Sequence, residues 1–146
     1  MPFFISQPLN SSSVLEGQNL TLQWNYNLTG QANDFTRIVK VTVGSQTGVA
    51  TRRGTDIATV AAGYENQFIV SISDTEAILT ILAVPRSVNE EKYKLVIFAT
   101  SNALTSVDVD ISVLCEYKAY CRKISTLYKV TALQVKKVHI PCVSSV

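Results

Sequence analysis

The side chains best suited to catalysis or metal binding are few, and they gather near the carboxyl end of the chain. His139 is the only histidine, and the three cysteines are Cys115, Cys121 and Cys142. A serine or cysteine nucleophile needs a base within hydrogen-bond reach, and residues 1–114 contain no histidine to serve as that base. The cysteines and the histidine also lack the C-x-x-C pair typical of zinc sites. We therefore expect no enzyme and no metal or other cofactor.

Two aspartates in the sequence VDVDI are of the residue type found in paired-acid catalytic sites, but their position in the sequence is that of solvent-facing strand residues. Asp108 and Asp110 alternate with Val107, Val109 and Ile111. This alternation is typical of a strand with one buried face, and it turns both aspartates toward solvent. We interpret the pair as the polar side of a strand.

Net charge divides the chain after residue 114. Residues 1–114 contain 7 Lys and Arg against 10 Asp and Glu, whereas 115–146 contain 6 against 1 and all three cysteines. We predict one domain over 1–114 and a basic, cysteine-containing tail over 115–146, whose structure the sequence does not specify. The cations of the tail could contact nucleic acid or acidic lipid. Few aromatic residues lie among them, however, and we expect no nucleic-acid partner.

Alternation of apolar and polar side chains dominates the first 114 residues and indicates β-strands. Leu20, Leu22 and Trp24 alternate with polar residues, and segments rich in Gly, Asn, Asp and Ser separate the apolar runs. With 47% apolar and 16% charged residues, the chain can fill one core of ordinary size. These features predict an all-β fold, an antiparallel two-sheet Greek-key sandwich. Further strands are expected at 37–43, 68–72, 77–84, 93–99 and 107–113.

Three segments resemble sequence patterns of immunoglobulin variable-type domains. The stretch 68–81 matches F-x-x-S-x-S-x-T-x-x-x-L-T-I, and 16–22 resembles the family's approach to its second strand. Tyr93 resembles the tyrosine two residues before the second cysteine of the family's disulfide. The resemblance covers roughly residues 8 to 114 and implies an immunoglobulin-like sandwich.

The chain departs from that family at both ends of the expected inter-sheet disulfide. Trp24 stands in place of the first cysteine and Leu95 in place of the second, while Ile38 or Val39 replaces the core tryptophan of the third strand. A cross-link closing about 70 residues would stabilise the fold by roughly 4 kcal/mol. Burying ~200 Å² of a tryptophan contributes on the order of 5 kcal/mol. We therefore predict that a core of Trp24, Leu95 and Tyr93 replaces the disulfide.

Fibronectin type III domains offer an alternative. They also lack the disulfide, and they resemble this chain in having a tryptophan on the second strand and a tyrosine on the sixth. Both families are β-sandwiches, so the expected fold class is the same. The SISDTEAILTI match favours the immunoglobulin type, because the fibronectin family has no such pattern.

Three N-x-S/T sequons begin at Asn10, Asn19 and Asn27, in segments expected to be loops or strand ends. Chance occurrence is the alternative, but together with the resemblance the sequons imply an extracellular or cell-surface location. The amino terminus lacks the basic start and long apolar run of a leader, and no apolar run approaches the ~20 residues that span a bilayer. We expect that a leader and a membrane anchor are missing from this sequence.

The resemblance implies a protein-binding module of a cell-surface recognition or adhesion receptor. Its partner is then another protein, with the same domain on an opposing cell as one candidate. The alternative is a structural spacer, of immunoglobulin or fibronectin type III kind, in a multi-domain extracellular protein.

Related variable-type domains often pair through the sheet that would contain 37–43 and 93–99 here. On these strands we expect a binding face at Lys40, Thr42, Lys94 and Val96, with the parity of each strand open by one residue. By the same analogy, the loops 28–35, 44–49 and 101–106 are expected at the binding end of the family's fold.

Overall fold

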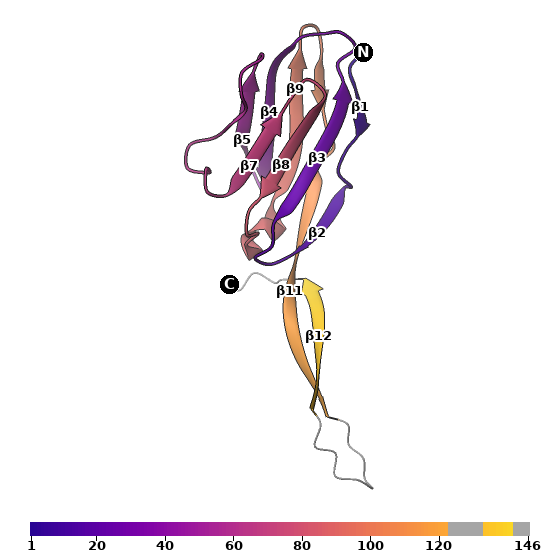
Figure 1. Ribbon diagram of the computed structural model, residues 1–146, viewed down its shortest axis with the longest axis vertical. Coiled ribbons are helices and arrows are strands. Elements are labelled where there is room, and N and C mark those ends of the chain that lie inside the picture. The colour runs from indigo at the N-terminus through magenta and orange to yellow at the C-terminus, as the bar shows by residue number, and fades with distance from the viewer. Residues whose placement is uncertain (123–132, 142–146) are drawn as a thin grey trace.

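The computed structural model describes residues 1–122 and 133–141, which form two β-sheets packed face to face (Figure 1). The smaller sheet is antiparallel and has the order β1-β3-β8-β7, with β3 and β8 at its centre. Its strands are β1 (Phe3–Ser6), β3 (Leu20–Asn27), β7 (Phe68–Ile72) and β8 (Glu76–Ile81).

The larger sheet has the order β12-β11-β9-β4-β5-β6, with β10 paired to β9 and β2 paired in parallel to β11. A short 3-10 helix, η1, joins β8 to β9. The prediction of an antiparallel two-sheet sandwich is confirmed. The elements are β2 (Ser11–Leu15), β4 (Asn33–Thr42), β5 (Ser45–Arg53), β6 (Thr59–Val60), η1 (Arg86–Glu90), β9 (Lys92–Ala99), β10 (Ala103–Thr105), β11 (Val109–Arg122) and β12 (Leu133–Pro141).

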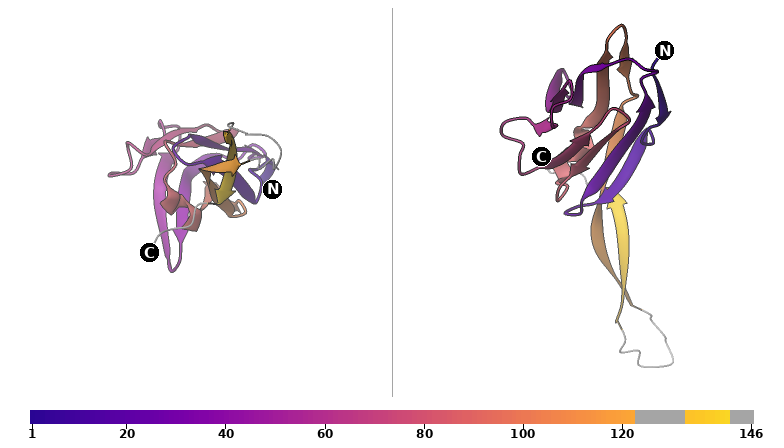
Figure 2. Two further views of the ribbon diagram at one scale, coloured as in Figure 1. Left: turned by 90° about the horizontal axis from the view of Figure 1, so that it is seen from below. Right: turned by 45° about the horizontal axis from the view of Figure 1, so that its top comes forward.

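Strand β11 continues beyond the sandwich and forms an antiparallel hairpin with β12 (Figures 1 and 2). The pairing runs from Leu114 opposite Pro141 to Arg122 opposite Leu133. The boundary expected after residue 114 therefore lies inside one continuous strand, and the division into a domain and a tail stays a prediction. Cys115, on the same strand, is disulfide-bonded.

Period-two alternation builds the strands that line the core. In β3, Leu22, Trp24 and Tyr26 are buried, whereas Thr21 and Gln23 are exposed. Burying the apolar set fixes the direction of every side chain on the strand, because neighbouring residues point to opposite faces. The buried residues of β8 and β9 repeat the pattern: Ala77, Leu79, Ile81, Tyr93, Leu95, Ile97 and Ala99.

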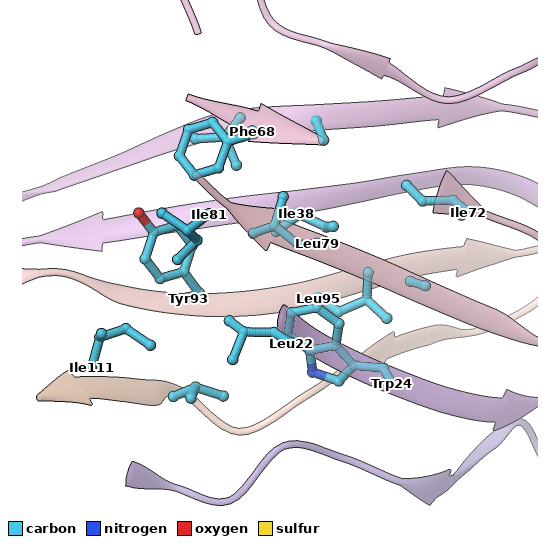
Figure 3. Packing of buried hydrophobic residues seen from close by; sticks show 14 of the residues in the cluster. Leu22, Trp24, Ile38, Phe68, Ile72, Leu79, Ile81, Tyr93, Leu95 and Ile111 are labelled. Carbon is cyan, nitrogen blue, oxygen red and sulfur yellow. The ribbon is translucent and has the colours of Figure 1, made fainter. Parts of the chain in front are cut away.

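Trp24 lies in the core between the two sheets (Figure 3). Its side chain is fully buried, and Leu95 projects from the opposite sheet into the same cluster of core residues. Within the described part of the chain, Trp24 Nε1 has no hydrogen-bond partner, which offsets some of the gain from burying the ring. Covalent cross-linking contributes nothing between these positions, because residues 1–114 contain no cysteine.

Two buried tyrosines use their hydroxyl groups at opposite ends of the core. The Tyr26 hydroxyl donates to the carbonyl oxygen of Ser73 at 2.6 Å, and the Tyr93 hydroxyl donates to Glu91 Oε2 at 2.8 Å. Burial raises the pKa of both tyrosines well above the ordinary value of 10.0. The carboxylate of Glu91 raises the pKa of Tyr93 further.

Truncating the central indole should remove cooperative unfolding. Trp24→Ala is expected to cost about 3–5 kcal/mol in the free energy of unfolding, a large part of the total stability of a typical domain. The matched control is Gln23→Ala, which alters the exposed neighbour on the same strand and should cost less than about 1 kcal/mol. Urea denaturation monitored by far-ultraviolet circular dichroism, which does not depend on tryptophan fluorescence, measures the free energy of unfolding of both variants. A loss below about 1 kcal/mol for Trp24→Ala would contradict a central role for this residue.

The two buried tyrosines predict a loss of stability at high pH. Below pH 10 both are protonated in the folded and unfolded states and add no pH dependence. Above it the unfolded chain loses these protons first, so each tyrosine lowers the free energy of unfolding by up to about 1.4 kcal/mol per pH unit. Denaturant titrations from about pH 8 to about pH 11 test this, with Tyr26→Phe/Tyr93→Phe as the comparison. An alkaline slope that is the same in that double variant would show that other groups cause it.

Candidate functional site

The described residues contain no assembled catalytic or metal-binding cluster. Among the residues whose side chains the structure describes, no group of three or more His, Cys, Asp or Glu is placed to hold a metal ion. Only the backbone is described at Cys121 and His139, and Cys142 lies outside the described residues. Asp108 and Asp110 are both exposed, and Asp110 lies 3.6 Å from Lys92 Nζ. No helix in this part of the chain is long and apolar enough to cross a membrane.

The outer face of the larger sheet is the candidate site, and the strand register defines it. Residues directly opposite one another on neighbouring antiparallel strands share a face. Reading across β9, β4 and β5, the outward residues form four rows. Starting at the end of the sheet where β9 turns into β10, the rows are Phe98, Phe35 and Arg53; Val96, Arg37 and Thr51; Lys94, Val39 and Gly48; and Lys92, Val41 and Gln46.

An aromatic pair occupies the first of these rows. Phe35 and Phe98 are stacked with ring centroids 6.0 Å apart, and the Arg53 guanidinium lies 5.6 Å from the Phe35 ring. Phe98 is 44% exposed even though it lies on a strand whose other face is fully buried. The cation–π contact holds Arg53 against the aromatic pair instead of leaving it free in solvent.

Three cations run diagonally across the same strands. Arg53 on β5, Arg37 on β4 and Lys94 on β9 lie in successive rows, and such diagonal neighbours are about 7–8 Å apart. In the described part of the chain, none of the three forms an ion pair. Lys92, in the fourth row, differs because Asp110 neutralises it. The centre of the face is therefore positively charged, with aromatic rings on one side.

Val39 is a buried apolar residue in one of the outward rows. It belongs to the third row, between Lys94 and Gly48, yet it is fully buried and lies outside the core cluster that contains Ile38. Opposite this point β5 has a bulge, because Ile38 pairs with Ala50 and Val39 with Gly48. Both faces of β4 are thus packed at 38–39, which holds the strand rigidly. Of the two residues expected to replace the third-strand tryptophan, Ile38 is the one in the core cluster.

The structure brings together two of the four residues predicted for a binding face. Lys94 and Val96 lie on the outer face. Lys40 is opposite Tyr93 and therefore on the inner side, where its Nζ lies 3.5 Å from Glu91 and 5.0 Å from the Tyr64 ring centroid. Thr42 has the same parity as Lys40, at the end of β4. The predicted set therefore mixed two parities, and the residues that share a face with Lys94 and Val96 on β4 are the odd-numbered ones.

The residues that give the face its chemistry were not predicted from the sequence. Phe35 fell in an expected loop and Arg37 at the start of an expected strand, whereas Arg53 lies on β5, which was not predicted as a strand. On β9 the signal was available, since placing Tyr93 and Leu95 inward turns Phe98 outward with Lys94 and Val96. On β4 the apolar run IVKVTV alternates weakly, and only the pairing with β9 shows which parity faces solvent.

Comparison with known proteins places this geometry in a common architecture. No family model matches the chain, and no curated protein matches it. Solved structures do match. The fold is immunoglobulin-like.

Three solved structures illustrate the likeness. A chain from a structure on the basis of T cell specificity and activation by the bacterial superantigen toxic shock syndrome toxin-1 has a TM-score of 0.63 and 17% identity, over 78% of this chain and 100% of its own. A chicken TCR chain has a TM-score of 0.62 and 13% identity, over 80% of this chain and 55% of its own. Murine CRIg has a TM-score of 0.58 and 13% identity, over 76% of this chain and 98% of its own.

The loops of this immunoglobulin-like domain gather differently from the expectation. Thr100 N donates to Ala32 O at 3.1 Å, so the loop before β4 and the loop after β9 lie at one end, as expected. The segment 44–49 does not join them, because it forms the turn from β4 into β5 at the other end and most of it is strand. The turn after β5 takes its place, since Gly54 N donates to Asp34 O at 3.0 Å. The strand β5 was not predicted, because its sequence contains glycine and threonine and lacks a regular apolar alternation.

A depression of about 470 Å³ lies beside the loop that precedes β4. It is lined by residues of β1, the end of β3, the loop after β3 and the turn before β8, among them Ile5, Asn27, Leu28 and Asp74. Its lining shows no cluster of charged or nucleophilic groups that would define a ligand.

The three sequon asparagines are exposed, and none lies on β4, β5 or β9. Asn10 precedes β2, Asn19 precedes β3, and Asn27 ends β3. Asn19 Oδ1 accepts from Ala83 N at 2.9 Å, and Asn27 Oδ1 accepts from Thr29 N at 2.7 Å. A glycan attaches to Nδ2, so both bonds can persist after glycosylation.

The exposure of these asparagines predicts stepwise glycosylation in a secretory host. The full chain expressed behind an added leader should shift in mobility after glycosidase treatment, and each of Asn10→Gln, Asn19→Gln and Asn27→Gln should remove one step. The measurement is gel mobility with intact-mass analysis. Unchanged mobility of the secreted chain after glycosidase treatment would contradict use of the sequons.

Proposed function

We propose that this chain is a protein-binding immunoglobulin-like module of a cell-surface recognition receptor, and that it binds through the outer face of β9, β4 and β5. The observation that carries the proposal is the exposed aromatic pair beside cations without ion-pair partners among the described residues. Aromatic residues and arginine are the types most enriched where proteins bind one another. The face belongs to central strands held on both sides, so it can meet a partner without ordering a loop.

The proposal includes a variable-type assignment. Two features of the topology support it: β5 and β6 extend the larger sheet beyond β4, and β2 joins β11 while β1 stays in the smaller sheet. Trp24, Leu95 and Tyr93, all fully buried, are proposed to do the work of the family's disulfide. The solved structures that resemble the chain include chicken TCR and murine CRIg, which supports a receptor-type module.

An extracellular or cell-surface location is proposed on two grounds. All three sequon asparagines are accessible. Cys115 is disulfide-bonded, and disulfides persist mainly in oxidising compartments.

A negative charge placed in the aromatic pair of the proposed contact should abolish binding. Phe98→Asp is expected to lower binding of the multimerised full chain to an array of extracellular proteins from the same organism by at least about tenfold, because the carboxylate would be desolvated in the interface. The matched control is Ile69→Asp. Ile69 is 59% exposed on β7, in the smaller sheet, and should tolerate the change without loss of binding.

Two results would oppose this proposal in different ways. Equal loss in the Ile69 and Phe98 variants would place binding elsewhere or reveal a folding defect, which thermal unfolding of both variants would identify. Failure of the intact chain to bind any extracellular protein would favour the structural spacer.

A further inference from the structure

We propose that the partner of this face is an acidic protein surface with an adjoining apolar or aromatic patch, and not a second copy of the domain. This inference rests on the proposed function and adds the chemistry of the ligand. Arg53, Arg37 and Lys94 form a diagonal of cations without ion-pair partners in the described chain. These charges determine the sign of the charge that a partner must carry.

The acids near this diagonal do not neutralise it. Asp110 is taken by Lys92, and Glu91 is taken by Lys40 on the inner side of the sheet. Asp34 is exposed at the irregularity in the pairing of β4 with β9, next to Phe35, and forms no ion pair in the described residues. Positive charge therefore dominates the middle of the face, while the acids lie at its margin.

A second copy of the domain is a poor match for this charge distribution. A two-fold symmetric dimer buries the same patch from both subunits. Face-to-face pairing would then bring two sets of three cations together, and like charges in an interface disfavour association. The complementary surface carries carboxylates, at a spacing of about 7–8 Å to match the diagonal.

The apolar residues distinguish a protein from a sulfated carbohydrate. Phe98, Phe35 and Val96 occupy three positions of the first two rows. A carbohydrate polyanion would use the cations but gain little from a stacked aromatic pair with one ring 44% exposed. An acidic protein surface with an adjoining apolar patch satisfies both features at once.

Three polymers serve as probes in one binding assay. They are a glutamate–tyrosine copolypeptide, polyglutamate of matched charge, and heparin, each measured against the immobilised full chain. We expect the copolypeptide to bind at least tenfold more tightly than polyglutamate. Phe98→Ala should remove that advantage and leave polyglutamate binding unchanged, whereas Arg37→Gln should weaken both polypeptides at least threefold. Increasing salt should weaken both.

A matched control separates the face from the rest of the chain. Arg86→Gln removes one exposed cation at η1, where Arg86 pairs with Glu16 at 2.8 Å, and should change no affinity. The basic segment after residue 114 is the same in every variant, so it adds a constant background to all measurements. Only the difference between variants bears on the face.

Three outcomes would overturn the inference. Equal copolypeptide binding by the intact chain and Arg37→Gln/Arg53→Gln/Lys94→Gln would place acidic binding outside the face. Tighter binding of heparin than of the copolypeptide, dependent on the same cations, would assign the face to a sulfated carbohydrate. Reversible self-association in sedimentation that Phe98→Asp abolishes would assign it to a second copy. If one of these outcomes occurs while binding to the extracellular-protein array still depends on Phe98, only the acidic partner is excluded and the proposed function stands. If binding to the array does not depend on Phe98, the proposed function itself is excluded.

Discussion

The structure depends on burial of the inner faces of β9 and β4 against the smaller sheet, without a disulfide between the sheets. Because side chains alternate along a strand, the residues that enter the core determine which ones reach solvent. Leu95 and Ile97 point inward, and this places Val96 and Phe98 on the outer face. Core and candidate site are thus two sides of the same strands. A change that loosens the packing around Trp24 would also displace the outer face.

The bulge in β5 affects which side chains are buried at the centre of the larger sheet. It pairs Ile38 with Ala50 and Val39 with Gly48, so that neighbouring residues of β4 are buried on opposite faces. A glycine on the neighbouring strand leaves Val39 without a side chain opposite it on that side. The outer face therefore has one fully buried apolar side chain, Val39, among its charged rows.

Sequence reasoning identified the fold class because the alternation in β3, β7, β8 and β9 is regular, and each strand buries one face. It missed β5, since glycine and threonine give SQTGVATRR the composition of a turn while its strand conformation comes from pairing with β4. Lys40 was misplaced for a similar reason. In IVKVTV, hydropathy favours neither parity, and a lysine on the inner side is tolerated only because Glu91 and Tyr64 are there to meet it. Such contacts join residues far apart in sequence and are invisible to a pattern of period two.

The three cations at the centre of the outer face repel one another in the free domain, although Arg53 also contacts the Phe35 ring. At about 7–8 Å, two like charges in water repel by about 0.5 kcal/mol, and salt reduces this further. Arg53, Arg37 and Lys94 form two such neighbouring pairs, so their arrangement costs the isolated domain up to about 1 kcal/mol. Elsewhere the fold places acids beside exposed cations, as with Glu16 beside Arg86 and Asp110 beside Lys92. No described acid pairs with the three cations at the centre of the face. Such an acid would also neutralise the surface offered to an acidic partner. A small cost in stability is the expected signature of a surface whose charges are compensated only in a complex.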